Sequence, residues 1–256
     1  MLEKIIGILG GMGPYATVDL FKKILDFTPA NKDADYLHII IDNNPKVPNR
    51  RKALTEGGPD PTPELQRMAK KMEIAGADFL LIGCNSAHAF IQRVQEAVDI
   101  PIISIIEETA RETKLHNPNI TKVGLLAGTG TIKLKLYDKA FADKGIEVIQ
   151  HENGLQERVL HVIDSVKAKV SVEDIKPEII SVCHELIKLG AQAIIGGCTE
   201  IPIVLKDGDL TVPVVDANEY YAKAAVNYAL GRIPLPSKKI IIENSLFYYP
   251  KGRVNY

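Results

Sequence analysis

Short apolar segments alternate with longer amphipathic segments along the whole of this 256-residue chain. The short segments are continuously apolar and rich in β-branched residues, which is typical of parallel strands buried on both faces. The longer segments repeat apolar positions at helical spacing. This alternation predicts an α/β fold of parallel sheets with helices on both faces. The predicted strands are 4–9, 36–41, 78–83, 101–106, 122–127, 145–150, 192–197 and 211–216, and the predicted helices are 14–27, 63–75, 86–98, 132–144, 154–168, 172–189 and 217–230.

The second half of the chain repeats landmarks of the first half. Gly76 and Gly190 each begin a Gly-Ala pair and a short apolar segment, and Cys84 and Cys198 follow at the same distance. The spacing between matching landmarks is nearly constant, which indicates an internal duplication. Two copies of one half that face each other would bring the two thiols to opposite walls of one cleft.

The duplication predicts two α/β domains, each with a mostly parallel four-stranded sheet flanked by helices. The polar stretch 116–121 is interpreted as the junction, and the chain is expected to cross back near residue 210. The first domain is therefore predicted to comprise 1–116 with 211–256 and the second 117–210, with the active site at their interface.

Composition narrows the class of protein. The net charge of −1 gives no electrostatic reason to expect nucleic acid or an anionic membrane as a partner. No apolar run approaches the roughly 18 residues of a membrane span, and the short apolar stretch after Met1 does not resemble a signal peptide. Three cysteines without a C-x-x-C pair fit a reducing cytoplasm better than a disulfide framework or a metal site.

Cys84 and Cys198 each follow a predicted strand and precede polar residues. Thiolates are favoured in such places by nearby backbone N–H groups. The alternative is that both are small buried side chains, as free cysteines often are. Cys183 lies within a predicted helix, has no counterpart in the other half and is interpreted as a packing residue. His88, one helical turn after Cys84, is a candidate to tune that thiol or a satisfied residue at a helix start.

Two glycine-rich turns and one long connection are further candidates. The turn at 10–14 could bind an anion through its amides or could be a tight turn with Pro14 at the first helical position; it is not the G-x-G-x-x-G fingerprint. The turn at 128–131 occupies the matching place in the second half. The connection 42–63 is rich in proline and glycine and contains Arg50, and a connection of this length is usually functional. We expect it to act as a lid.

Together these residues resemble the aspartate/glutamate racemase family, and most closely its aspartate racemase branch. The matching motifs are Gly10-Gly-Met-Gly-Pro14, Cys84-Asn-Ser-Ala-His88 and Gly197-Cys-Thr-Glu-Ile201. Gly128-Thr-Gly-Thr131 and Val47-Pro-Asn-Arg50 match less tightly. The resemblance covers residues 4 to about 230, and the segment 236–256 lies largely outside it.

The resemblance implies a racemase that needs no cofactor and no metal, with two domains related by a pseudo-twofold. One thiolate would remove the α-proton of aspartate while the other thiol delivers a proton to the opposite face, and the catalytic residues would be Cys84 and Cys198. Arg50 and Lys167 would hold the side-chain carboxylate in aspartate-specific members. Glu200, which closely follows Cys198, is either a proton carrier or a capping residue. The residues implied around the substrate are Met12, Arg50, Asn85, Ser86, Thr131, Lys167, Thr199 and Glu200.

The chain departs from the family pattern at Ser86, where threonine is usual, and at Lys169, where glycine is usual. These departures leave the reaction type intact and bear on substrate choice. The alternatives are a glutamate or broad-specificity amino-acid racemase, a hydantoin racemase or maleate isomerase, and a non-catalytic amino-acid-binding protein on the same fold. The expected partners are a small amino-acid substrate and a second copy of the chain in a homodimer.

Overall fold

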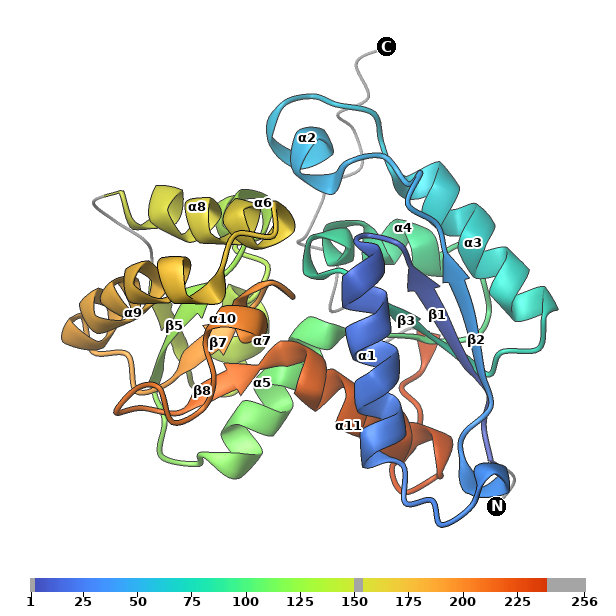
Figure 1. Cartoon of the computed structure of the whole chain (residues 1–256). Helices are drawn as coiled ribbons and strands as arrows, with labels where there is room; N and C mark the ends of the chain where they lie inside the picture. The colour runs from blue at the N-terminus through green and yellow to red at the C-terminus, as the bar shows by residue number, and fades with distance from the viewer. Residues whose placement is uncertain (1–2, 150–153, 239–256) are drawn as a thin grey trace. The chain divides into compact units, whose positions relative to one another are not determined.

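The structure is a computed structural model that describes residues 3–149 and 154–238. The chain divides into two compact units, Met1–Ile105 with Tyr221–Tyr256 and Ile106–Tyr220. Each unit contains one four-stranded sheet with parallel pairing between neighbouring strands (Figure 1). The strand orders are β2-β1-β3-β4 and β6-β5-β7-β8, which are the same order counted within each unit. The predicted α/β class with two parallel four-stranded sheets is confirmed.

The first unit is built on strands β1 (Ile6–Gly10), β2 (Ile39–Asn43), β3 (Phe79–Ile82) and β4 (Ile102–Ile103). The inner strands β1 and β3 are buried along their whole length, whereas the edge strand β2 is partly exposed. This is why the inner strands are continuously apolar. The helices that begin in this unit are α1 (Pro14–Phe27), α2 (Arg50–Thr55), α3 (Thr62–Ile74), α4 (Ile91–Gln95) and α5 (Ile105–His116), with short 3₁₀ helices η1 (Asp33–Asp35) and η2 (Asn85–Phe90).

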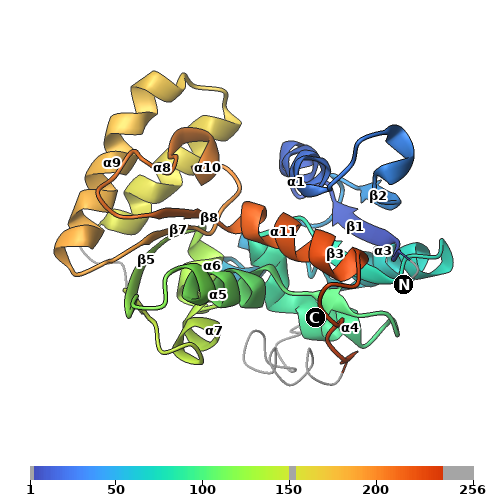
Figure 2. The same cartoon turned by 90° about the horizontal axis from the view of Figure 1, so that it is seen from below.

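The second unit is built on β5 (Lys122–Leu126), β6 (Glu147–Ile149), β7 (Ile194–Gly196) and β8 (Val214–Asp216). Figure 2 shows α8 and α9 together on one face of this sheet and α6 and α7 on the other. Right-handed crossovers produce this arrangement, because the chain first moves outward from β5 to β6 and then back past β5 to β7. The helices of this unit are most of α5, then α6 (Thr129–Lys133), α7 (Asp138–Ala142), α8 (Leu155–Lys167), α9 (Val172–Lys188), α10 (Ile201–Val204) and the start of α11 (Ala217–Ala229).

Equivalent glycines in the two sheets allow helices to approach closely. A Cβ at Gly7 in β1 would lie 3.3 Å from Cβ of Met72 in α3. A Cβ at Gly124 in β5 would lie 3.1 Å from Cβ of Leu186 in α9. The duplicated Ile-Gly and Val-Gly landmarks of the sequence therefore mark the same packing requirement in each unit.

The structure differs from the predicted domain boundaries at both crossings. The segment 211–220 belongs to the second unit because β8 pairs with β7, and most of α5 also belongs to that unit rather than to the first. The predicted strand 101–106 is only partly a strand. Its middle forms β4, and its last two residues already belong to helix α5. The end of the predicted strand 145–150 and most of the segment 236–256 lie outside the described residues. Among the residues described, no helix is long and apolar enough to cross a membrane.

Candidate functional site

Cys84 lies at the carboxyl end of β3, two residues beyond the strand. The Gly83 N–H donates to the Leu9 carbonyl over 3.0 Å, which extends the pairing of β3 with β1 to the point where the cysteine leaves the sheet. The Cys84 thiol is free and half-buried, and Cys84 is the residue directly before η2. Of the two residues that follow, Asn85 is buried and Ser86 half-buried. The structure thus brings three predicted site residues to one edge of the first sheet.

His88 is fully buried and holds the backbone of Cys84 rather than its sulfur. Its Nδ1 lies 2.9 Å from the Cys84 carbonyl, and its Nε2 lies 3.1 Å from the backbone N of Ile105. Because the Ile105 N–H can only donate, Nε2 is the acceptor and Nδ1 carries the proton. Burial lowers the pKa of His88 to about 4, so the imidazole is neutral near pH 7. His88 is therefore a positioning residue and not a base for the thiol.

Tyr221 supports the same edge and was not found from the sequence. Its hydroxyl donates to the Ile103 carbonyl over 2.6 Å and accepts from the Ile82 N–H over 3.1 Å. Its ring lies edge-on to that of His88, with 6.3 Å between the ring centroids. A buried tyrosine in an amphipathic helix reads as ordinary packing, so no local signal in the sequence indicates this role.

The glycine turn after β1 is closed by a side chain. Thr17 Oγ1 accepts from the Gly11 N–H over 2.9 Å and donates to the Gly13 carbonyl over 3.2 Å. Gly11 has φ +89, which favours glycine. The Gly11 amide is therefore already satisfied, and the interpretation as a tight turn before α1 fits the structure better than an anion site that uses all of its amides.

Arg50 and Met12 are brought together in the first unit. Arg50 begins α2 inside the long connection, which therefore contains a helix rather than being an open loop. Its Nη1 donates to the carbonyls of Val47 and Pro48 over 3.0 and 2.9 Å, and its Nη2 donates to the Met12 carbonyl over 3.3 Å. The Arg50 Nε is buried and has no hydrogen-bond partner among the described residues.

Cys198 occupies the equivalent position in the second unit, two residues beyond β7. The Gly197 N–H donates to the Leu126 carbonyl over 2.9 Å, as Gly83 does in the first unit. The Cys198 thiol donates to Glu200 Oε2 over 2.9 Å, and Thr199 Oγ1 donates to the same oxygen over 3.1 Å. Glu200 precedes α10 but makes no side-chain cap hydrogen bond. Its carboxylate therefore accepts from the cysteine thiol and does not cap the helix.

Lys167 completes this cluster from the last turn of α8. Its Nζ lies 3.9 Å from Glu200 Oε1 and 3.8 Å from Asp164 Oδ1. Burial is the main cause that raises the pKa of the Cys198 thiol well above its usual value, the Glu200 carboxylate adds to the rise, and Lys167 opposes it. The arrangement thus stabilises Cys198 as a thiol, which is the form that donates a proton. Cys183 is buried in α9, and burial raises the pKa of its thiol to about 12.

Thr131 is fully buried in α6, just after the exit of the neighbouring strand β5. Gln156 in α8 donates through Nε2 to the Ala127 carbonyl over 3.0 Å at the same exit, and its Oε1 is buried with no hydrogen-bond partner among the described residues. No local pattern in the sequence indicates Gln156, because a glutamine on an amphipathic helix has no distinctive spacing.

The predicted site residues thus form two sets, one within each unit. The set at the carboxyl edge of the first sheet consists of Met12, Arg50, Cys84, Asn85 and Ser86. The set in the second unit consists of Thr131, Lys167, Cys198, Thr199 and Glu200. All of these except Thr131 form one cluster around the Glu200 carboxylate. Each set contains a free cysteine at a strand exit. In the second set the thiol is hydrogen-bonded to the Glu200 carboxylate, which is chemistry suited to proton transfer.

Comparisons with known proteins extend over nearly the whole chain. The sequence model of the family described as Asp/Glu/hydantoin racemase matches residues 9–225. A protein from Bacillus subtilis (strain 168), the broad specificity amino-acid racemase RacX, is 30% identical over 240 residues, which cover 88% of this chain and 98% of that protein.

Solved structures are similar as well. The aspartate racemase of Picrophilus torridus has a TM-score of 0.74 and 27% identity, with 94% of this chain and 99% of that chain covered. An aspartate racemase homologue from Pyrococcus horikoshii OT3 has the same TM-score and identity, with 89% and 99% covered. A glutamate racemase from Francisella tularensis, solved with D-glutamate, is 20% identical with a TM-score of 0.64 over 96% of this chain and 93% of its own, a likeness of fold.

Proposed function

The chain belongs to the Asp/Glu/hydantoin racemase family, and from this premise we propose that it interconverts L- and D-aspartate with Cys84 and Cys198 as the two acid–base groups and without pyridoxal phosphate. The observation that carries the proposal is the equivalence of the two thiols. Each is free, and each lies two residues beyond the third strand of its unit. A racemase needs a base on one side of the α-carbon and an acid on the other, and duplicated thiols can supply both.

The proton inventory of the proposed reaction balances without a further reactant. The Cα–H bond breaks as an S–H bond forms at Cys84, and a new Cα–H bond forms on the opposite face as the S–H bond at Cys198 breaks. We assign the first thiolate to Cys84 because Glu200 favours the thiol at Cys198. After one turnover the thiolate is at Cys198, and this is the form of the protein that accepts the opposite enantiomer.

Arg50 is the proposed ligand of the side-chain carboxylate. Its guanidinium has five N–H donors, and three hydrogen bonds to backbone carbonyls account for three of them. The Nε–H and one Nη2–H remain, and two donors of this kind match the two oxygens of a carboxylate. The buried Nε without a partner supports this assignment, since an unsatisfied buried donor costs roughly 1–3 kcal/mol.

Lys167, the second proposed ligand of that carboxylate, already neighbours two acidic side chains of its own unit. Its proposed contribution is therefore twofold: it adds positive charge for a dicarboxylic substrate, and it limits the effect of Glu200 on Cys198. Asn85, Ser86, Thr131 and Thr199 are the proposed donors to the α-carboxylate, and Met12 is proposed to line the site beside the glycine turn. The protein is further proposed to act in the cytoplasm as a homodimer.

The broad-specificity relative makes a wider substrate range the main alternative. The deciding experiment follows Cα–H exchange by NMR in D₂O for L-aspartate, L-glutamate and a panel of neutral L-amino acids. Exchange and racemisation that are fastest for aspartate support the proposal. Preference for alanine or serine overturns the aspartate assignment in favour of the broader range. Binding of amino acids without exchange overturns the catalytic assignment.

A further inference from the structure

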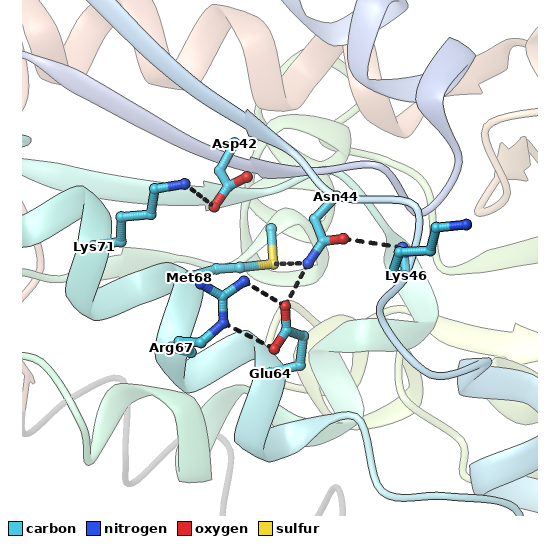
Figure 3. Close-up of polar contacts among 7 residues, drawn as sticks. All are labelled: Asp42, Asn44, Lys46, Glu64, Arg67, Met68 and Lys71. Carbon is cyan, nitrogen blue, oxygen red and sulfur yellow. Dashed lines mark hydrogen bonds and ion pairs between the residues drawn. The ribbon is translucent and has the colours of Figure 1, made fainter.

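A network of polar side chains lies at the carboxyl end of β2, outside the residues described so far. Figure 3 shows Asn44, the first residue after the strand, between Glu64 and Lys46. The Asn44 Nδ2 donates to Glu64 Oε1 and also contacts the Met68 sulfur at 3.8 Å. Glu64 in turn accepts from Arg67, through Nε at 3.0 Å and Nη2 at 2.6 Å. Helix α3 therefore holds the Glu64 carboxylate in a fixed place, from which it orients the Asn44 amide.

The orientation of the Asn44 amide sets the backbone that follows. With Nδ2 on an acceptor, Oδ1 faces the Lys46 N–H and accepts from it over 3.0 Å. This bond, from an asparagine side chain to the backbone two residues later, defines a turn. The Glu64 acceptor thus determines the direction in which the chain leaves β2.

Asn44 also rests directly on the glycine turn. Its N–H donates to the Gly10 carbonyl over 3.3 Å. A Cβ at Gly11 would lie 2.3 Å from the carbonyl carbon of Asn44, so the two backbones are in close contact. Six residues later, Arg50 contacts the same turn through the Met12 carbonyl at 3.3 Å. The segment 44–50 is therefore attached to the glycine turn at both ends.

We propose that Asn44 and Glu64 are positioning residues that place Arg50 and thereby determine selectivity for a substrate with an acidic side chain. This inference rests on the role proposed for Arg50 above. Glu64 does not touch the substrate in this scheme. It acts through Asn44, the turn at 44–46 and the backbone carbonyls of Val47 and Pro48 that bind the guanidinium.

The test compares aspartate with asparagine, its neutral isostere, as substrates for Cα–H exchange. We expect Glu64→Ala to lower kcat/KM for aspartate about tenfold, mainly through KM, and to change the value for asparagine less than twofold. Glu64→Gln retains an acceptor for Asn44 and is expected to restore most of the preference. Lys71→Ala is the matched control, because Lys71 is on the same helix and binds β2 through Asp42 at 3.2 Å without contacting Asn44. It should leave both substrates near the wild-type values.

A double variant separates positioning from general structural support. If Glu64 acts through Arg50, then Glu64→Ala in the Arg50→Ala background produces no further loss of aspartate preference. An equal loss for both substrates, or an additive loss in the double variant, overturns the inference. Should Glu64→Ala fail to fold, Arg67→Met removes the exposed partner that orients Glu64 and is expected to lower the aspartate preference about threefold; an unchanged preference in that variant also overturns the inference.

The same data distinguish this inference from the proposed function. If Arg50→Ala leaves the preference for aspartate over asparagine unchanged, the proposed role of Arg50 is wrong, and the inference falls with it. If Arg50→Ala abolishes the preference but Glu64→Ala does not, only the positioning role fails. If the wild-type protein exchanges no amino acid, calorimetric dissociation constants for aspartate and asparagine replace kcat/KM, with the same expected pattern and the same overturning results.

Discussion

The thiol of Cys198 donates a hydrogen bond to Glu200 Oε2 over 2.9 Å, and no equivalent acid stands two residues after Cys84, where Ser86 occurs. The duplicated halves of the chain thus carry matching thiols in unlike surroundings. Burial and the neighbouring carboxylate both favour the protonated thiol at Cys198. The asymmetry assigns the role of first proton donor to Cys198 in the proposed reaction.

The first prediction is that Glu200→Gln lowers the pKa of the Cys198 thiol. The substitution removes a like charge while keeping the size of the side chain, and one neighbouring charge typically shifts a pKa by about one pH unit or more. We expect Cys198 to react with iodoacetamide about tenfold faster at pH 8 in the variant, as measured by mass spectrometry of the labelled peptide. Burial remains, so the pKa should stay above that of a solvent-exposed thiol.

Two comparisons serve as controls for this measurement. Lys167→Met removes the charge that opposes the rise, so labelling of Cys198 should become slower rather than faster. Labelling of Cys84 in the same samples should be unaffected by either substitution. Equal labelling of Cys198 in the wild-type protein and both variants would show that the Glu200 carboxylate does not control the thiol.

The second prediction concerns the two thiols themselves. Cys84→Ser and Cys198→Ser should each reduce racemisation by roughly a hundredfold or more, since an acid–base group commonly contributes 10²–10⁴-fold. One of the two variants should still exchange the Cα–H of a single enantiomer with D₂O, because the remaining thiol reaches only one face. Cys183→Ala is the matched control and should retain activity. Full activity in either serine variant would exclude the two-thiol mechanism.

The third prediction is a dependence of stability on pH that originates at His88. The folded-state pKa of about 4 lies below the ordinary value of 6.5, so the unfolded chain binds the proton more readily. The contribution of neutral His88 to stability is complete above pH 6.5 and is lost as the pH falls toward 4. Its size is on the order of 3 kcal/mol. Urea unfolding followed by circular dichroism between pH 7 and pH 4.5 measures the loss.

His88→Asn provides the comparison for that experiment. Asparagine can still donate toward the Cys84 carbonyl but does not titrate in this range. The variant should be less stable than the wild-type protein at pH 7 and should lose less stability on acidification. If the two proteins show the same pH dependence, the titration of His88 is not its source.

The fourth prediction compares two glycines that both have positive φ. Gly11→Ala should destabilise the protein by roughly 2–4 kcal/mol, because it adds both a strained φ and a clash with the Asn44 backbone. Gly57 also has a positive φ, +67, but no atom of the described residues lies within 4 Å of the Cβ that Gly57→Ala would add. Its cost should be about 1 kcal/mol. Equal losses in thermal or urea unfolding would mean that the contact with Asn44 is relieved by local movement.

The sequence was sufficient to predict the strands and helices that have a clear apolar pattern within their own residues. The inner strands β1, β3, β5 and β7 are buried on both faces, so their composition alone revealed them, and α1 begins at Pro14 and ends at Phe27 as predicted. The duplication also placed both cysteines at strand exits, because the same spacing from Gly76 and Gly190 encodes the same turn after the same strand.

Helix α5 was missed because its buried face is partly polar. Glu108, Thr109, Glu112 and Thr113 are all buried, and Arg111 pairs with both glutamates, so the helical period of apolar residues is weak. The predicted helix 132–144 is broken in the structure into α6 and α7, and Lys135 between them has φ 50. In both places tertiary interactions outweigh the local pattern.

Which atoms meet at the site was decided only by the tertiary structure. The spacing of His88 from Cys84 allows contact with either the sulfur or the carbonyl, and the Ile105 N–H, far along the chain, fixes the choice. From the sequence, Glu200 could have capped α10, but in the fold its carboxylate accepts from the Cys198 thiol. Arg50 could have pointed into solvent, but its guanidinium donates to the Met12 carbonyl. The sequence by itself determined which residues reach the strand exits, because burial is recorded in local apolar patterns. The partner of each polar group depends on residues brought together by folding, and no local pattern records that.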